Sequence, residues 1–407
     1  MNFEIEPLKK EFANILNETL QEKLLSPPFK IKTGKDLVED FKIRCVKYID
    51  SINNLVETEN TDDLVSEIKS KSNTIHRLYQ TITSAMENFL AGDIKEAYDV
   101  FDQGLSETEI SRIIFEISIP LSDLFDEKNK LYRVRKSDKP LKSRQDMFHL
   151  PFNKRHLVGA QRYSVAGLPC LYLGTSIFVC WLEMEKPDFD KLYISAFEPA
   201  NKSNELNIID FAYTIHSMFN FERNEILFNT ETTDEFKKRA LARLVLLPLV
   251  IACNYIKSES NAHFNVEYII PNLLMQWISR TKRDNVDGIM YKTTKMKNEV
   301  NSKIGINVII PPKITYNDSI SNNYCPRLAS TFKLTNPVPW QVFRTLEFKD
   351  FDFYSDSESS IKKYKGIRNL DEALVKHYKA TEFYKIERTI NELMESNLIS
   401  ERYIKVS

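Results

Sequence analysis

Apolar residues recur every three or four positions over the first 125 residues, with charged residues between them. Residues three or four apart share one face of a helix, so this spacing predicts amphipathic helices. The pattern is most regular over residues 36–57 and 63–91, and Thr61 supplies a capping signal before the second stretch. We predict a helical N-terminal domain, residues 1–125, that regulates or oligomerises the protein.

The pattern changes near residue 126 to short apolar runs typical of strands, with helical stretches among them. Because strands and helices do not alternate regularly, an α+β domain is favoured over a doubly wound parallel sheet. We assign this domain to residues 126–345. The expected strands lie at 130–135, 169–174, 191–197 and 306–312, and the clearest helices at 236–256 and 268–280.

The remaining part of the chain, residues 346–407, first loses its apolar periodicity. Residues 351–366 are rich in aromatic and then polar residues, which indicates a linker. An amphipathic pattern returns over about 369–397 and predicts a C-terminal helix.

Composition narrows the class of protein. The 407 residues suggest two or three structural units, and 56 Lys+Arg against 57 Asp+Glu leave a net charge of −1. The chain therefore has no large net positive charge that would favour binding to nucleic acid or to an anionic membrane. The N-terminus lacks the features of a signal peptide, and the longest apolar run, 244–253, is about half of the ~20 residues that a membrane helix needs. With five scattered cysteines as reduced thiols, we expect a cytoplasmic protein with neither membrane nor nucleic-acid partners.

Several common motifs are missing from the sequence. It has no GxxxxGK[ST], GxGxxG, HExxH, CxxC or GxSxG, and its six histidines are far apart. We therefore expect no P-loop, no dinucleotide fingerprint, no nucleophile elbow and no metal.

The stretch LYLGTSIFVCWLEM, residues 171–184, combines an apolar run with a carboxylate. We expect a strand that ends at Gly174, followed by a helix capped by Thr175 or Ser176 and running to about Lys186. Glu183 lies seven residues after Ser176, on the same face and near the core. A buried charge is costly unless it has a partner or a function.

Around this stretch the sequence resembles a known family. LYRVR (131–135), DMFHLPFNKR (146–155) and RYSVAGLPCLYLGTSIFVCWLE (162–183) are similar to the signature region of the RES domain. EYIIPNLLMQWI (267–278) and DGIMYKTTK (287–295) are similar to its C-terminal half. The resemblance covers roughly residues 126–340.

The resemblance implies a fold like that of ADP-ribosyltransferases and an activity on NAD. Studied members are bacterial toxins, usually encoded beside an antitoxin, that consume NAD or transfer ADP-ribose. Thr293 occupies the position of the family's serine. The implied catalytic residues are Glu183, Tyr172, Arg162, Arg133 and Thr293, and the implied NAD-binding residues are Arg133, Arg162, Tyr172, Ser164 and Tyr291.

These residue types suit NAD cleavage. A carboxylate such as that of Glu183 can stabilise the oxocarbenium-like ribose and hydrogen-bond its hydroxyls. The planar guanidinium groups of Arg133 and Arg162 match phosphate oxygens, and the ring of Tyr172 can stack on the cationic nicotinamide. NAD is then a substrate, and no metal is required.

Each residue also has a purely structural interpretation. Glu183 could form an ion pair with an arginine, Tyr172 could be a core aromatic, and Arg135 and Arg155 compete with the two chosen arginines. His149 is more typical of a loop-ordering residue than of a proton-transfer group.

The leading functional hypothesis is an NAD-consuming toxin or defence effector that works by hydrolysis, phosphorolysis or ADP-ribosyl transfer. The main alternative is a non-catalytic interaction protein that retains the RES fold, and a nucleic-acid-binding module comes third. The expected partners are NAD, an antitoxin protein and a second copy of the chain.

Overall fold

The chain divides into two structural units, each described here by itself. Unit 1 contains Met1–Ile119, Ala160–Ala166 and Ile209–Val286, and unit 2 contains Pro120–Gly159, Gly167–Ile208 and Asp287–Ser407. The structure is a computed structural model. It describes residues 5–20, 25, 27–31, 36–125, 129–200, 205–213, 232–259, 262–280, 286–296, 303–345 and 377–399.

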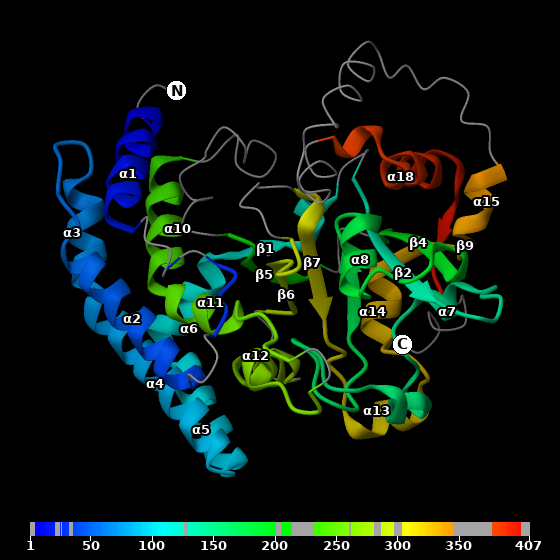
Figure 1. Cartoon of the computed structure of the whole chain (residues 1–407), viewed down its shortest axis with the longest axis horizontal. Coiled ribbons are helices and arrows are strands. Elements are labelled where there is room, and N and C mark those ends of the chain that lie inside the picture. The colour runs from blue at the N-terminus through cyan, green and yellow to red at the C-terminus, as the bar shows by residue number, and fades with distance from the viewer. Residues whose placement is uncertain are drawn as a thin grey trace. The chain divides into compact units, whose positions relative to one another are not determined.

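Unit 1 is built from helices. The N-terminal helices carry their apolar residues on one face, as the sequence predicts, and helices from residues 233–279 pack against them (Figure 1). Its elements are α1 (Ile5–Leu20), α2 (Leu37–Asn53), α3 (Asp62–Ser70), α4 (Ser72–Leu90), α5 (Ile94–Ser106), α6 (Thr108–Glu116), α10 (Thr233–Val245), α11 (Leu247–Cys253), η6 (Val266–Tyr268) and α12 (Ile269–Ser279).

Two helices expected to be continuous are each divided. The stretch 63–91 breaks at Lys71, which separates α3 from α4. The stretch 236–256 breaks at Leu246, because Pro248 stands in the first turn of α11 and has no N–H to donate to a preceding turn. Apolar periodicity runs through both breaks, so it does not reveal them.

Unit 2 combines short strands and helices around a sheet, and the α+β class predicted from the sequence is confirmed. The strands β1 (Ser118–Pro120) and β5 (Asn207–Phe211) begin in one unit and end in the other. The remaining elements are η2 (Leu121–Leu124), β2 (Leu131–Lys136), α7 (Arg144–Met147), η3 (Phe152–Leu157), β3 (Leu171–Gly174), α8 (Ile177–Glu183), η4 (Phe189–Lys191), β4 (Leu192–Pro199), β6 (Gly288–Lys292), η7 (Lys303–Gly305), β7 (Ile306–Ile310), α13 (Tyr316–Ser321), α14 (Pro326–Thr331), β8 (Phe332–Thr335), β9 (Val338–Pro339), α15 (Trp340–Thr345), η9 (Tyr378–Ala380), α18 (Glu382–Leu393) and β10 (Ser396–Asn397).

The strands of unit 2 lie in the order β6-β7-β3-β2-β4-β8-β10, with β9 beside β4. Each of these neighbouring pairs is antiparallel. The four strand runs expected from the sequence all form strands, with β2, β3, β4 and β7 matching them to within two residues.

One face of this sheet is covered by helices. Tyr132 and Val134 of β2 pair with Ala196 and Ile194 of β4, so the four side chains point to the same face. They belong to the main core of unit 2, whose helical members include Phe178, Leu182, Trp340, Phe383, Ile386 and Ile390.

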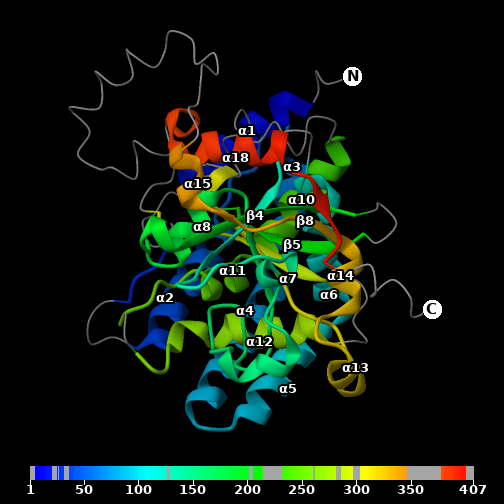
Figure 2. The same cartoon turned by 90° about the vertical axis from the view of Figure 1, so that its right-hand side faces the viewer.

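The C-terminal helix, expected over about 369–397, is α18. It packs on α8 and lies beside α15, as both views show (Figures 1 and 2). The expected linker at 351–366 and the expected helical residues 369–376 lie outside the described residues.

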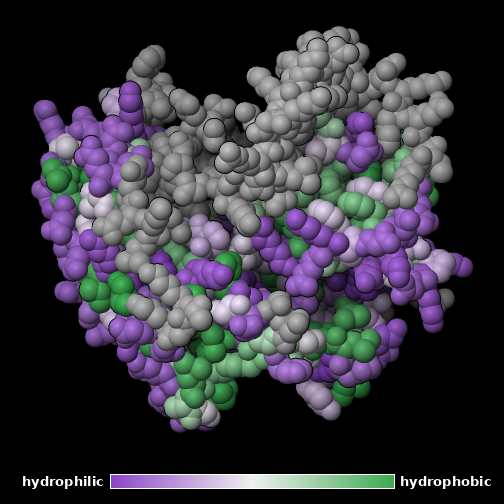
Figure 3. Space-filling view, in the orientation of Figure 1, coloured by the Kyte–Doolittle hydropathy of each residue, from purple (hydrophilic) through white to green (hydrophobic). Residues whose placement is uncertain are grey.

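Figure 3 shows one face of the protein coloured by hydropathy. In the view of Figure 3, hydrophilic residues are interspersed with separate hydrophobic patches. None of the described helices combines the length and the apolar character that crossing a bilayer requires.

Candidate active site

The helix that carries Glu183 begins as the sequence predicts. Ser176 is its N-cap, and its hydroxyl accepts the Val179 N–H at 3.0 Å and donates to the Ile304 carbonyl at 2.5 Å. Gly174 lets this helix approach β3 closely, because a Cβ there would lie 2.5 Å from Val179 Cγ1 and 2.7 Å from Cys180 Sγ.

The helix ends earlier than expected. It was predicted to run to about Lys186, but Glu183 is its last residue. Glu185 and Lys186 follow with φ of 65° and 56°, in the left-handed region, and this turn terminates the helix before Pro187. Glu183 therefore stands at a helix end, and its side chain is half-buried rather than enclosed in the core.

Two side chains donate hydrogen bonds to one oxygen of Glu183. Thr293 Oγ1 lies 2.7 Å from Oε1, and Asn307 Nδ2 lies 2.8 Å from the same atom. Thr293 and Asn307 are 3% and 5% exposed. Both donors are thus fixed by their surroundings, and they orient the carboxylate.

The backbone around these donors explains their position. Thr293 directly follows β6, and its N–H donates to the Gly305 carbonyl at 2.8 Å. Asn307 is on β7, where it pairs with Tyr291 on one side and with Gly174 on the other. Lys295, two residues after Thr293, donates from Nζ to the Glu183 carbonyl at 3.0 Å.

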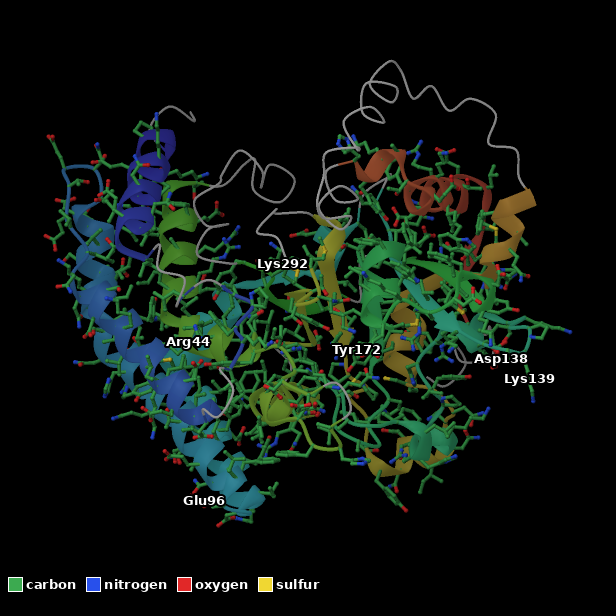
Figure 4. All side chains as sticks on the ribbon, viewed as in Figure 1. Arg44, Glu96, Asp138, Lys139, Tyr172 and Lys292 are labelled. Carbon is green, nitrogen blue, oxygen red and sulfur yellow. The ribbon has the colours of Figure 1, made fainter. Side chains whose placement is uncertain are left out.

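Tyr172 and Tyr291 share the sheet face of Asn307. Residues directly opposite in antiparallel strands point to the same side, as do residues two apart along a strand. Tyr172 pairs with Ile309 and Tyr291 pairs with Asn307, which places both tyrosines on the face covered by α8. Figure 4 shows Tyr172 and Lys292, the last residue of β6, near the two ends of β7.

Arg133 lies on the other face of the sheet. It follows Tyr132, which pairs with Gly174 on the α8 face, so alternation along β2 directs Arg133 away from α8. Its Nη1 donates to the Tyr172 carbonyl at 2.9 Å. Burial and, secondly, the charge of Arg135 lower the pKa of Arg133 to about 9. Arg133 therefore supports the backbone of the strand that carries Tyr172.

Arg162 and Ser164 belong to unit 1, apart from the unit that holds Glu183. Arg162 is 8% exposed, and its Nη1 donates to the Cys253 carbonyl at 2.9 Å. Its guanidinium carbon lies 5.1 Å from the centre of the Tyr268 ring. Ser164 is buried, and its backbone pairs with that of Gln161.

The competing residues have structural contacts. Arg135 donates to the Phe148 carbonyl at 2.6 Å, and Arg155 donates to the Phe152 carbonyl at 3.2 Å. His149 is fully buried; its Nδ1 donates to the Leu150 carbonyl and its Nε2 accepts the Cys325 N–H. Burial lowers the pKa of His149 to about 3, so a neutral histidine orders this loop.

Sequence reasoning missed Asn307. Its signal was weak but present, because it is a polar residue in the otherwise apolar run INVII of a buried strand. A polar side chain at such a position needs a hydrogen-bonding partner, and here the partner is Glu183.

The described residues hold no group of three or more His, Cys, Asp or Glu that could bind a metal ion. The chemistry available to this part of the site is that of an oriented carboxylate. Among the described residues, no other hydrogen bond or ion pair involves the Glu183 side chain.

Comparisons with known proteins give one informative match. No protein-family model matches the chain, and no solved structure matches it. Over 328 residues, which are 77% of this chain and 68% of the other protein, the sequence is 29% identical to a Bacillus subtilis (strain 168) protein named "Putative toxin YopC". The chain is thus similar over most of its length to a protein that bears the name of a toxin.

Proposed function

We propose that the chain is a toxin or defence effector that cleaves the bond between nicotinamide and ribose in NAD. One observation carries the proposal, the Glu183 carboxylate whose Oε1 is held by Thr293 at 2.7 Å. The resemblance to the RES domain assigns the catalytic carboxylate and the hydroxyl to these two positions. The name of the Bacillus subtilis relative supports the toxin role.

The proposed reaction begins with departure of the nicotinamide. The bond between ribose C1′ and the ring nitrogen breaks, and its electron pair leaves with neutral nicotinamide. Positive charge develops on the ribose, where the anionic Glu183 stabilises it. Water, phosphate or a nucleophilic group of a macromolecule then forms a bond to C1′ and releases a proton.

The remaining site residues would bind and orient NAD. The resemblance to the RES domain implies that Tyr172 and Tyr291 bind NAD, and an aromatic ring attracts the cationic nicotinamide. The resemblance to the RES domain also implies that Arg162 and Ser164 bind NAD, and Arg133 would act through the Tyr172 backbone, to which it donates a hydrogen bond. An antitoxin protein and a second copy of the chain are the proposed macromolecular partners.

The test is incubation of the purified full chain with NAD, followed by chromatography of the products. All three reactions release free nicotinamide. The second product is ADP-ribose in hydrolysis, ADP-ribose phosphate in phosphorolysis and a modified protein in ADP-ribosyl transfer. Glu183→Gln is the control for contaminating activities. If NAD remains intact with water, phosphate and a cell extract as acceptors, the proposal is wrong, and an interaction protein becomes the better hypothesis.

A further inference from the structure

The catalytic helix α8 is bonded to a residue far along the chain. Oε1 of Glu387, in α18, accepts the backbone N–H of Ile177 at 2.7 Å, across 210 residues of sequence. Ile177 is the first residue of α8, and Glu183 is its last. The bond therefore joins the C-terminal helix to the start of the helix that carries the candidate catalytic carboxylate.

Glu387 is an unusual residue for its surroundings. It is 6% exposed within an apolar core, and the hydroxyl of Tyr378 donates to the same oxygen at 2.5 Å. Burial raises the pKa of Glu387 to about 8. Burial of a carboxyl group is unfavourable unless the group is protonated or well hydrogen-bonded. An apolar side chain would fill this space without that desolvation cost.

Aromatic contacts extend the connection between α18 and α8. The ring of Phe383 lies 5.3 Å from that of Phe178 and 5.6 Å from that of Trp181. Tyr378, in η9, lies 6.3 Å from Phe178. The segment 377–399 thus contacts the backbone of α8 and two of the side chains of α8, Phe178 and Trp181.

The helix α8 depends on such contacts. It has seven residues, whereas isolated helices shorter than about 12 residues are marginal in water. Its position must come from the Ser176 cap, the close approach at Gly174 and the packing of α18. A displacement of about 1 Å at a catalytic group can reduce a rate about 100-fold.

We propose that Glu387 is a positioning residue, which holds the N-terminal end of α8 and thereby places Glu183 for NAD cleavage. The inference rests on the proposed function. Because Glu387 acts through the helix backbone, its loss lowers kcat and leaves KM nearly unchanged. Its action requires a hydrogen-bond acceptor at this position and does not require a negative charge.

The environment of Glu387 supports action as an acceptor. Tyr378 from η9 faces it directly, and Tyr132 from β2 and Cys180 from α8 lie close enough for the charge of Glu387 to raise their pKa values. On its own helix, Arg388 forms an ion pair with Glu392. The near groups are thus two hydroxyls, a thiol and a backbone N–H. The hydrogen bonds from Tyr378 and Ile177 lower the pKa of Glu387, but burial outweighs them and favours the protonated form at pH 7.

The experiment compares Glu387→Gln with Glu387→Leu in the full chain, with NAD as substrate. Glutamine keeps a carbonyl oxygen that accepts both hydrogen bonds, so kcat should stay within about twofold of the wild type. Leucine fills the space without an acceptor, and kcat should fall at least about tenfold with KM within twofold. Glu392→Gln, at an exposed position of the same helix, is the matched control and should cleave NAD normally.

Either of two results overturns the proposal: wild-type turnover in Glu387→Leu, or an equal loss in Glu387→Gln and Glu387→Leu. Cooperative unfolding is checked for each variant. If Glu387→Leu does not fold, Glu387→Met, which is closer in length to glutamate, replaces it.

A second measurement does not depend on NAD. Hydrogen exchange of peptides covering residues 175–186 should accelerate in Glu387→Leu and remain as in wild type in Glu387→Gln, while β2 and β4 stay protected. Unchanged exchange in Glu387→Leu contradicts the anchoring of α8. If exchange of residues 175–186 is faster in Glu387→Leu but the wild-type protein does not cleave NAD, Glu387 anchors α8 and the proposed function is wrong.

Discussion

The side-chain nitrogen of Asn307 lies 2.8 Å from Oε1 of Glu183, the same oxygen that accepts the Thr293 hydroxyl at 2.7 Å. Two donors on one oxygen restrain the orientation of the carboxylate. Asn307 lies on β7 and Thr293 directly follows the neighbouring strand β6, while the carboxylate comes from α8. The position of this carboxylate therefore depends on how the helix is held against these strands.

Changing Asn307 to aspartate should make NAD cleavage, relative to wild type, weaker at high pH than at low pH. Above neutral pH the introduced carboxylate repels Glu183, because like charges would face each other at hydrogen-bond distance. In acid the introduced group is protonated and can donate to Oε1, so turnover should recover by about tenfold or more from pH 8 to pH 5, relative to wild type. Asn307→Ala should be impaired at both pH values.

The control for Asn307→Asp is Asn317→Asp, which adds the same charge at an exposed position of α13. Its pH profile should match that of wild type. A constant ratio of Asn307→Asp to wild-type activity across the pH range would show that Asn307 does not act on the charge of Glu183.

Replacing Glu183 by glutamine should reduce NAD cleavage by about 100-fold or more, because the amide cannot supply negative charge to the ribose cation. The fold should remain intact, since the side chain keeps its size and half-buried position. Rates are measured by nicotinamide release and folding by circular dichroism. Glu185→Gln changes a carboxylate that is 75% exposed two residues away and should keep full activity. Normal turnover in a folded Glu183→Gln protein would refute its catalytic role.

Thr293 should be replaceable by serine but not by valine. Serine keeps the hydroxyl that donates to Glu183, and loses only a methyl group that lies 3.6 Å from the position of a Cβ on Gly305. Valine keeps the shape and removes the donor, so turnover should fall by about tenfold or more, while the melting temperature changes little. Similar rates for the two variants would mean that the hydroxyl is not needed.

The Glu387 carboxyl group should make the protein less stable as the pH rises. Its pKa is about 8 in the folded chain against an ordinary value of 4.5, so the folded state binds more protons between these values. Its contribution to the free energy of unfolding is complete below pH 4.5 and is lost as the pH rises through 8, by at most about 1.4 kcal/mol per pH unit.

Urea unfolding of wild type and Glu387→Gln at several pH values measures this contribution. The variant lacks the titrating group, so its stability relative to wild type should increase with pH across this window. Parallel stability curves for the two proteins would contradict the raised pKa.

A fragment that lacks residues 1–119 should aggregate rather than fold. In unit 1, α10, α11 and α12 pack against α3, α4 and α6, so removal of the N-terminal helices exposes the apolar faces of the later ones. Light scattering and a cooperative unfolding transition distinguish the outcomes. A soluble fragment that unfolds cooperatively would show that the later helices find sufficient burial without the N-terminal ones.

Local features of the fold could be predicted because neighbouring residues determine them. Ser176 caps α8 as its sequence suggests, and the expected strand runs form β2, β3, β4 and β7. The end of α8 was harder to predict from the sequence. It depends on the left-handed conformations of Glu185 and Lys186, which are not glycines. The backbone propensities of Glu and Lys do not predict a positive φ at these positions.

Features that depend on distant residues could not be predicted. The resemblance placed Glu183 and Thr293 in one site. The apolar pattern marks Asn307 only as a polar residue within a buried strand, and neither for Asn307 nor for Glu387 does it identify the distant partner. Grouping residues 209–286 with the N-terminal helices likewise reflects contacts between segments far apart in sequence. The division into domains near residue 125 and the roles of Arg162 and Ser164 stay predictions.

The hydrogen bond between Ile177 and Glu387 also has a consequence for the timing of protein synthesis. At about 5 to 20 residues per second, the ribosome needs roughly 10 to 40 s to add the 210 residues that separate the two partners. During that interval the nascent chain already contains Glu183, but the helix that carries it lacks its anchor. If Glu387 positions α8 as proposed, cleavage of NAD would stay below its full rate until translation has passed residue 387.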